Sequence, residues 1–269
     1  MRKLMSSAVN QTVRYAMPLF LACALASCSG GVGSPEQAVR KMVRAHGGDK
    51  QVARLQTFVG KGFIKDLSSR TVAESFAFDI YRKGPLYKHK ITKAPRGTIT
   101  NVLVLYYDGT TCRQWMNGAG IVEMPPLEVG ILRYRFPNVL QWAQEPGRAG
   151  ELLPADKSES VVRVRYKDGT SVLTLALDKK SWLLSGVEVR DLSDSTFVFN
   201  ETYEHYFDLD GNPFPASFKA TLKSSPYYEF ILPTVELKAE LPDSLFRVTA
   251  QDTSAFVKPA AAEQPSPKR

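Results

Sequence analysis

The stretch MVRAHGGDKQVARLQTFVGKGFIK, residues 42–65, contains the change of pattern that decides the fold. Ser34 is a suitable N-cap for a helix that runs into this stretch, and the two glycines at residues 47–48 end that helix. Asp49 then begins a second, short helix. From Thr57 onward apolar residues alternate with a period of two, which predicts that the chain changes from helix to strand here.

Short strands joined by tight turns are predicted as far as residue 238. Asp-Gly pairs such as the one at residues 108–109 suit tight hairpins, and strands joined so closely must be antiparallel. Residues 125–147 interrupt this pattern with helical spacing that Pro137 breaks. The sequence therefore predicts a mainly β (α+β) fold, in which helices pack on one face of a single curved antiparallel sheet. The predicted strands are 57–66, 71–83, 85–94, 98–108, 160–167, 170–178, 181–191, 195–210, 214–223 and 227–238.

Over residues 34–248 this order of elements resembles the LolA/LolB-like family of periplasmic lipoprotein carriers. The resemblance rests on residues 42–65, on the hairpin YYDGTTCRQWMNG at 106–118, and on the ending YEHYFDLDGNPFPASFKATL at 203–222. It implies an incomplete β-barrel over residues 34–250, in which an apolar cavity under a helical lid takes acyl chains.

The first 27 residues have the features of a lipoprotein signal peptide. Basic residues precede a short apolar run at 15–25, and Leu25-Ala26-Ser27-Cys28 resembles a bacterial lipobox. Cys28 is the expected lipidation site, because cleavage at Cys23 would shorten the apolar run. An ordinary signal peptide with a chance cysteine is the alternative. Residues 28–33 then form a lipidated tether, and the Pro/Ala-rich residues 251–269 form a disordered tail.

The net charge of the chain and its expected location limit the classes of partner that it can meet. Removing residues 1–27 takes away three basic residues and no acidic one, so the formal charge falls from +8 to +5. An exported, lipid-anchored chain with this mild charge is expected to meet anionic lipid surfaces and no nucleic acid, although the charge equally serves solubility. Ser29, in place of Asp after the lipidated cysteine, favours the outer membrane, with the protein facing the periplasm.

The sequence shows no pattern typical of catalysis or metal binding. It has no G-x-S-x-G or phosphate-binding glycine loop, and its three histidines, His46, His89 and His205, lie far apart. We interpret His46 as a helix-end residue and His89 as part of a surface strand between lysines. Cys112 is expected to be a partly buried apolar residue. We expect a non-enzymatic protein with no metal and no cofactor.

Apolar residues on two predicted strands and on the broken helix are the candidate ligand site. Strand 71–83 carries aromatic residues on one face, whereas both faces of strand 98–108 are apolar, Leu103 and Leu105 on one and Val104 on the other. A helix interrupted by proline would serve as a lid over this surface. The candidate residues are Phe76, Phe78, Leu103, Leu105, Ile131, Phe136 and Leu140.

Two functions fit these patterns. The first is an outer-membrane-anchored periplasmic lipoprotein that binds lipid, or the acyl chains of an acylated lipoprotein, in an apolar cavity during transport or envelope maintenance. The second is a non-enzymatic module on the same fold that binds an envelope protein partner or senses envelope stress. An exposed sheet edge would favour the second function.

The lipobox makes a prediction about processing. Cys28→Ala should abolish acyl labelling and leave unprocessed precursor, because the thiol of this residue accepts the lipid. Cys23→Ala is the matched control and should leave labelling intact. Labelling with a radioactive fatty acid measures both variants, and an exchange of the two phenotypes would move the start of the mature chain to residue 23.

Overall fold

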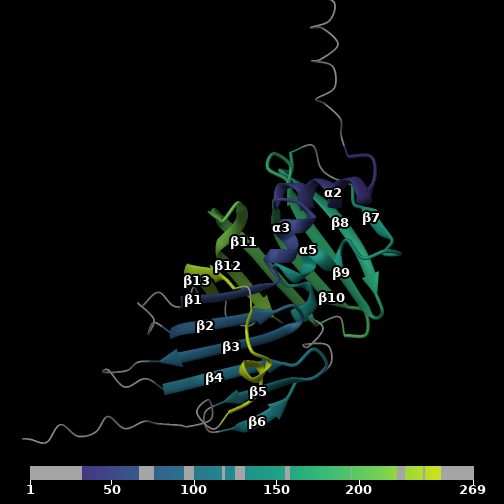
Figure 1. The fold of residues 1–269 in the computed structure, drawn as a ribbon. Coiled ribbons are helices and arrows are strands. Elements are labelled where there is room, and N and C mark those ends of the chain that lie inside the picture. The colour runs from purple at the N-terminus through teal and green to yellow at the C-terminus, as the bar shows by residue number, and fades with distance from the viewer. Residues whose placement is uncertain are drawn as a thin grey trace, which may run out of the picture. The chain divides into compact units, whose positions relative to one another are not determined.

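In the computed structural model, residues 32–66, 76–93, 100–116, 119–124, 131–154, 158–194, 196–222, 228–238 and 240–249 are described (Figure 1). The predicted signal peptide 1–27, the lipidation site Cys28 and the predicted tail 251–269 lie outside these residues. The chain divides after Gly33, and residues from Ser34 onward form one compact unit.

Two helices open this unit as the sequence predicts. Helix α2, Pro35–Ala45, is capped by Ser34, whose Oγ accepts a hydrogen bond of 3.3 Å from the backbone N–H of Gln37. Gly47 and Gly48 follow with φ angles of +90° and +82°, a conformation that glycine adopts without the steric cost of a side chain. Helix α3, Asp49–Arg54, begins directly after them.

Most of the remaining described residues form one antiparallel sheet of thirteen strands. The strand order is β6-β5-β4-β3-β2-β1-β13-β12-β11-β10-β9-β8-β7, so the sheet has two edges and is not closed into a barrel. This confirms the predicted mainly β fold. The strands are β1 Thr57–Asp66, β2 Phe76–Lys83, β3 Leu86–Lys93, β4 Thr100–Tyr107, β5 Cys112–Met116, β6 Gly120–Glu123, β7 Gly150–Leu152, β8 Val161–Asp168, β9 Ser171–Asp178, β10 Leu184–Asp191, β11 Val198–Leu209, β12 Asn212–Leu222 and β13 Tyr228–Leu237.

The helices pack on one face of the sheet, which we call the inner face. Helix α2 contacts β7 and β8 (Figure 1). Helix α5, Asn138–Trp142, places Trp142 edge-on against Tyr166 of β8. The helical segment breaks at Pro137 as predicted: one helical turn at residues 131–134 is followed by the cis Phe136–Pro137 peptide and then by α5. The described helices therefore lie over the β7–β12 half of the sheet.

The C-terminal segment covers the outer face of the other half. Val104, Tyr106 and Trp115 form a buried cluster there, and Val248 packs against it. Lys83 fixes the segment by donating through Nζ to the carbonyl of Leu241 at 2.9 Å, and a 3₁₀ turn, η2, follows at Asp243–Phe246 (Figure 1). The second apolar face of β4 is thus explained by this cover, and Val104 does not belong to a cavity.

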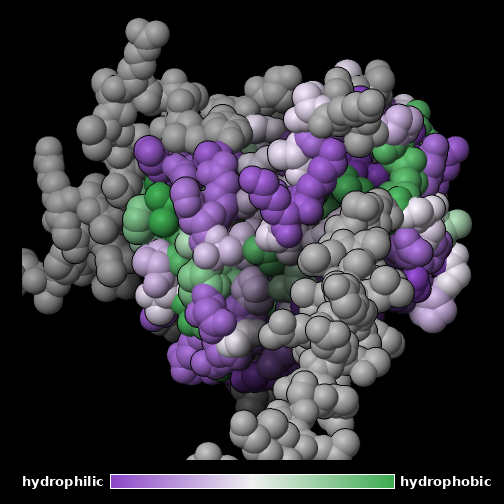
Figure 2. Space-filling view, turned by 90° about the horizontal axis from the view of Figure 1, so that it is seen from above, coloured by the Kyte–Doolittle hydropathy of each residue, from purple (hydrophilic) through white to green (hydrophobic). Residues whose placement is uncertain are grey.

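The surface of the described residues is mainly hydrophilic where it is seen from above, and hydrophobic groups on this face lie in smaller patches between the polar ones (Figure 2). Within the described ranges, no helix is long and apolar enough to cross a membrane.

The packing of the C-terminal segment predicts that two truncations will differ sharply in their effect on the stability of the fold. Deleting residues 241–269 removes the buried Leu241 and Phe246 and uncovers the Val104 cluster. The expected loss is about 3–5 kcal/mol, or roughly 10 °C in the melting temperature. Deleting residues 258–269 removes a segment without apolar periodicity and should change the melting temperature negligibly. Thermal unfolding followed by circular dichroism compares the two; equal losses would contradict the assigned cover.

Candidate functional site

An apolar row crosses the inner face of strands β2 to β6. The register pairs Phe78 with Ile91, Ile91 with Leu103, and Leu103 with Met116. The next row pairs Ile80 with His89, His89 with Leu105, and continues through Gln114 to Val122. We call the apolar members of these rows other than Ile80 the apolar strip: Phe78, Ile91, Leu103, Leu105, Met116 and Val122.

Exposure along the apolar strip rises from the middle of the sheet toward the β6 edge. Phe78 is 2% exposed, Leu103 and Leu105 are half-buried, Met116 is 40% exposed and Val122 is 53% exposed. Large apolar side chains exposed next to one another in a concave sheet are unusual for a filled core and are typical of a surface that receives a ligand.

His89 lies within the inner face beside the strip. The sequence led us to expect a surface position between two lysines, and this is wrong: the side chain is 6% exposed. Its ring packs edge-on against Phe78 and Tyr87 and near Phe230, at centroid distances of 5.4, 6.1 and 5.9 Å. Burial, reinforced by the charge of Arg135, lowers the pKa of His89 to about 3, so the imidazole is neutral.

Buried charges gather where the strip meets the half of the sheet covered by helices. Arg135, in the segment between the helical turn and α5, donates to Glu201 Oε1 through Nε at 2.9 Å and Nη2 at 2.6 Å. Tyr203 donates to Glu201 Oε2 at 2.6 Å, and the backbone N–H of Phe136 donates to the Tyr203 hydroxyl at 3.0 Å. Glu201 is therefore held by a cation and a hydroxyl, as a buried carboxylate must be.

A second arginine, Arg82, adjoins this pair. Its side chain is 2% exposed, and its Nε and Nη2 atoms have no hydrogen-bond partner within the described ranges. The guanidinium lies 5.6 Å from the centre of the Tyr87 ring, whose hydroxyl accepts a 3.4 Å hydrogen bond from Arg135 Nη1. Burial lowers the pKa of Arg82 to about 10, which leaves it charged at neutral pH. We call Arg82, Tyr87, Arg135, Glu201 and Tyr203 the arginine cluster.

The arginine cluster surrounds a cavity of about 30 Å³. Phe58, Phe214, Phe218 and Leu232 supply apolar walls around the polar groups. Pockets for drug-sized ligands measure about 300–1,000 Å³, whereas one water needs roughly 10–15 Å³ by a comparable measure. The cavity has room for about two water-sized groups and none for an acyl chain.

The structure divides the seven predicted site residues into two groups. Phe76, Phe78, Leu103 and Leu105 lie together on the inner face of β2 and β4. Phe136 instead packs on Tyr203, Tyr206 and Phe214, over β11 and β12, and Ile131 and Leu140 are buried in the same broken helical segment.

The broken helical segment is held on the inner face by several side-chain contacts. Tyr134 donates to Asp168 Oδ2 at 2.6 Å, and Arg135 pairs with Glu201. Trp142 packs between Tyr134 and Tyr166, with the guanidinium of Arg148 3.9 Å from its ring centre. These contacts make residues 131–142 a fixed wedge on the inner face.

The other two histidines and the cysteine lie apart from this site. His46 caps α2 as predicted, but burial lowers its pKa to about 4, so it is neutral and not the cation expected at a helix end. His205 is exposed on β11, and the thiol of the buried Cys112 lies 3.4 Å from the sulfur of Met124. In the part of the chain that the structure describes, no three His, Cys, Asp or Glu side chains are placed to hold a metal ion.

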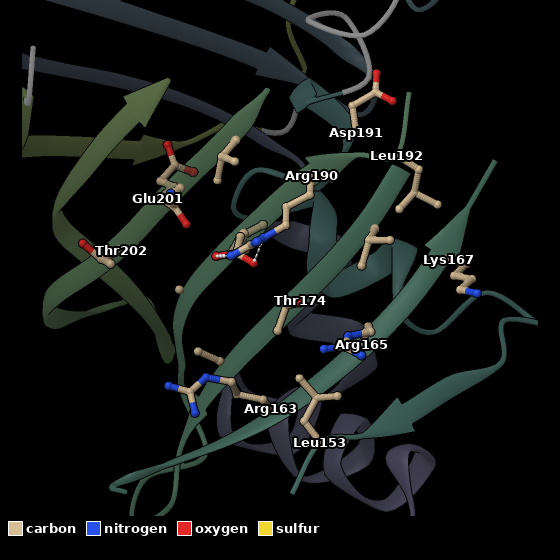
Figure 3. Close-up of a pocket in the computed structure, with 17 residues that line it drawn as sticks. Leu153, Arg163, Arg165, Lys167, Thr174, Arg190, Asp191, Leu192, Glu201 and Thr202 are labelled. Carbon is tan, nitrogen blue, oxygen red and sulfur yellow. Dashed lines mark hydrogen bonds and ion pairs between the residues drawn. The ribbon is translucent and has the colours of Figure 1, made fainter. Parts of the chain in front are cut away.

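A separate trough of about 870 Å³ lies on the outer face of β8 to β11 (Figure 3). Its floor consists of small residues, Ala176, Gly186 and Thr202, which the register aligns. Arg163, Arg165 and Arg190 line it, but Glu159, Glu151 and Glu188 pair with them respectively. Each of the three arginines of this trough is therefore paired with a carboxylate.

A solved structure shares this fold. A LolA superfamily protein from Nitrosomonas europaea is 12% identical to the chain; the match covers 81% of this chain and 99% of that protein, with a TM-score of 0.51. A DUF1329 family protein from Desulfovibrio piger (12% identity, 79% and 96% covered, TM-score 0.49) and an outer-membrane lipoprotein-sorting protein domain from Vibrio parahaemolyticus (11%, 77% and 97%, TM-score 0.46) are also similar. No protein-family model and no curated protein matches the sequence. The first of these structures confirms the LolA-like fold that the order of elements predicted.

The arginine cluster predicts a strong dependence of stability on Glu201. Glu201→Gln removes the only carboxylate among the five residues of the cluster and leaves Arg135 buried without its counter-charge, so the expected loss is about 3–5 kcal/mol. Glu188→Gln, which breaks the outer-face pair with Arg190, should lose less than about 1 kcal/mol. Urea unfolding measures both variants. Losses of similar size would mean that the Glu201 pair is effectively solvated.

Proposed function

We propose that this chain is a non-catalytic, lipid-anchored envelope protein that binds acyl chains along the apolar strip. The observation that carries the proposal is the rise in exposure from Phe78 to Val122 on the inner face. An acyl chain laid on the strip would bury these side chains, and each fully covered Leu, Met or Val is worth about 1.5–3 kcal/mol.

The strip, and not the space beneath the broken helical segment, is the proposed binding surface. The cavity at the arginine cluster is too small for a chain, and Phe136 and Leu140 are already covered by the protein. The ligand would enter from the β6 edge, where exposure is greatest. Of the seven predicted site residues, Phe78, Leu103 and Leu105 belong to the apolar strip, and Phe76 lies next to Phe78 on the inner face of β2.

The cellular setting of the proposal comes from the sequence. Lipidation at Cys28 would tether the domain through residues 28–33 to a membrane, and Ser29 favours the outer membrane with the domain facing the periplasm. The ligand would then be a lipid or an acylated lipoprotein encountered at that surface. The LolA-like fold supports a carrier of this kind.

A second candidate function is the binding of an envelope protein at the β6 edge. The four residues of β6 are exposed, and Ile121 and Val122 are each 53% exposed on a strand that ends the sheet. An edge strand of this kind can accept a further strand from a partner. Ile121 faces away from the strip, so its exposure is not explained by acyl binding.

A charged substitution at the centre of the strip should show which of these two functions the protein has. Leu105 is half-buried, so Leu105→Asp should fold but bind a fluorescent fatty acid at least about tenfold more weakly, because the chain would have to cover a carboxylate. Leu192→Asp, at a leucine that is 64% exposed outside the strip, is the control and should bind like the unchanged protein. Fluorescence titration gives the affinities and circular dichroism confirms folding.

Two outcomes would contradict acyl binding. One is an unchanged protein that binds no fatty-acid probe, and the other is an affinity that is equal in the Leu105→Asp and Leu192→Asp variants. Either would favour the partner site at β6.

A further inference from the structure

Arg82 is a buried cation whose Nε and Nη2 atoms have no hydrogen-bond partner within the described ranges. Its neighbours on its own and the adjacent strands are Ile80, Phe58 and Tyr87, and Glu201 and Tyr203 of β11 lie near enough to act on its charge without a hydrogen bond to it. A guanidinium has five N–H donors, and burying them without acceptors is unfavourable. Arg135 shows the contrast, because Glu201 accepts two hydrogen bonds from it.

The arginine cluster consequently carries an excess positive charge. Its five residues contribute two guanidinium groups and one carboxylate, and the two tyrosines are neutral because burial raises their pKa values. A buried excess charge of this kind is stabilised by an anion that enters the site. The adjoining cavity of about 30 Å³ has room for the two oxygens of one carboxylate.

We propose that Arg82, assisted by Arg135 and the Tyr87 hydroxyl, binds the carboxylate headgroup of the acyl ligand. This inference rests on the proposed function, since the apolar strip would hold the chain of the same molecule. The ligand class is then an anionic single-chain lipid with a carboxylate headgroup, such as a fatty acid.

The distance from Arg82 to the end of the strip fits one such molecule. Ile80 and His89, which lie between them, are 4% and 6% exposed, so the bound ligand must displace the side chains that cover this row. Arg82 and Ile80 are successive inner-face residues of β2, and Ile80 pairs with His89, which pairs with Leu105 of the strip. With a strand spacing of about 4.8 Å and a rise of about 3.3 Å per residue, the distance along the sheet from Arg82 to Met116 or Val122 is about 20 Å. This matches the length of a long fatty-acid chain, with the headgroup at the buried end and the chain end at the β6 edge.

The proposal also distinguishes between acyl ligands. The chains of a lipidated cysteine are attached through ester and amide bonds, which carry no charge and would leave Arg82 unpaired. A free fatty acid satisfies both the strip and the cation. The structure therefore favours a soluble anionic lipid over the acyl group of a lipoprotein as the ligand of this chain.

Two ligands that differ only in the headgroup test the inference. The purified full chain should bind dodecanoate about tenfold more tightly than dodecanol, because a charge-assisted pair replaces a neutral contact. Arg82→Gln should bring the two affinities within about twofold, and Arg82→Lys should keep part of the preference. Arg113→Gln, at an exposed arginine on the opposite face of β5, should behave as the unchanged protein. Isothermal titration calorimetry measures the affinity of the unchanged protein and of each variant for both ligands.

Thermal unfolding without ligand gives a second, independent readout. Removing an unpaired buried cation should raise the melting temperature by a few degrees. A structural arginine would have the opposite effect, so a lower melting temperature of Arg82→Gln together with a retained preference for dodecanoate would overturn the proposal.

The remaining outcomes separate this inference from the function on which it rests. If both ligands bind the unchanged protein equally well, the strip binds chains and the headgroup site is wrong. If neither binds, acyl binding fails as well. If inorganic phosphate raises the melting temperature through Arg82 while the two ligands bind equally, the site takes a free anion, which also overturns the headgroup assignment.

Discussion

The pairing of β1 with β13 determines the arrangement of the rest of the sheet. The register runs from Phe58 opposite Leu237 to Asp66 opposite Tyr228, and it joins the first and last strands in the middle of the sheet. Strands β2 to β6 extend from one side of this pair and strands β12 to β7 from the other. The two edges, β6 and β7, are therefore consecutive in the chain, although they lie at opposite ends of the sheet.

This topology forces one connection to cross the sheet. The chain that leaves β6 must reach β7, and it does so over the inner face, where Arg135 contacts Tyr87 of β3 and Glu201 of β11. The crossing covers the β7–β12 half with Phe136, Leu140 and Trp142, while residues of the β2–β6 half such as Leu103 and Met116 retain exposure. The division of the inner face into a packed half and an accessible half follows from the strand order.

The fold was predictable from the sequence because its signals are local. The period-two strands, the glycine corner at residues 47–48 and the break at Pro137 depend on neighbours in the chain, and the structure confirms each of them. The cover of a face depends on distant residues, and there the prediction for His89 was wrong. His89 was placed at the surface because two lysines flank it. The sequence of residues 241–248 likewise does not indicate that they pack over the face of Val104.

The site was predictable where it depends on neighbours in the chain, and it was not predictable where it depends on distant residues. The alternation of side chains along FAFDIYR places Arg82 on the same face of the strand as Phe78 and Ile80. The sequence therefore contains a charged residue in an apolar row. We did not use this signal, because the site was predicted from apolar residues alone. The sequence could not predict that Glu201 pairs with Arg135 and makes no hydrogen bond to Arg82. This pairing is a contact between residues more than sixty positions apart in the chain.

The two arginines show how one cluster can serve both stability and binding. Arg135 is satisfied within the protein, and its pair with Glu201 fixes the crossing segment against the sheet; burial alone would lower its pKa, but Glu201 and Tyr87 reverse this and raise it. Arg82 has no such partner, and its pKa falls. A protein that needed only a stable core would gain by replacing Arg82 with an apolar residue, since an unpaired buried charge is unfavourable. An arginine retained at the buried end of an apolar strip is instead suited to a ligand that brings its own negative charge, and the stability given up in the free protein becomes affinity when that ligand binds.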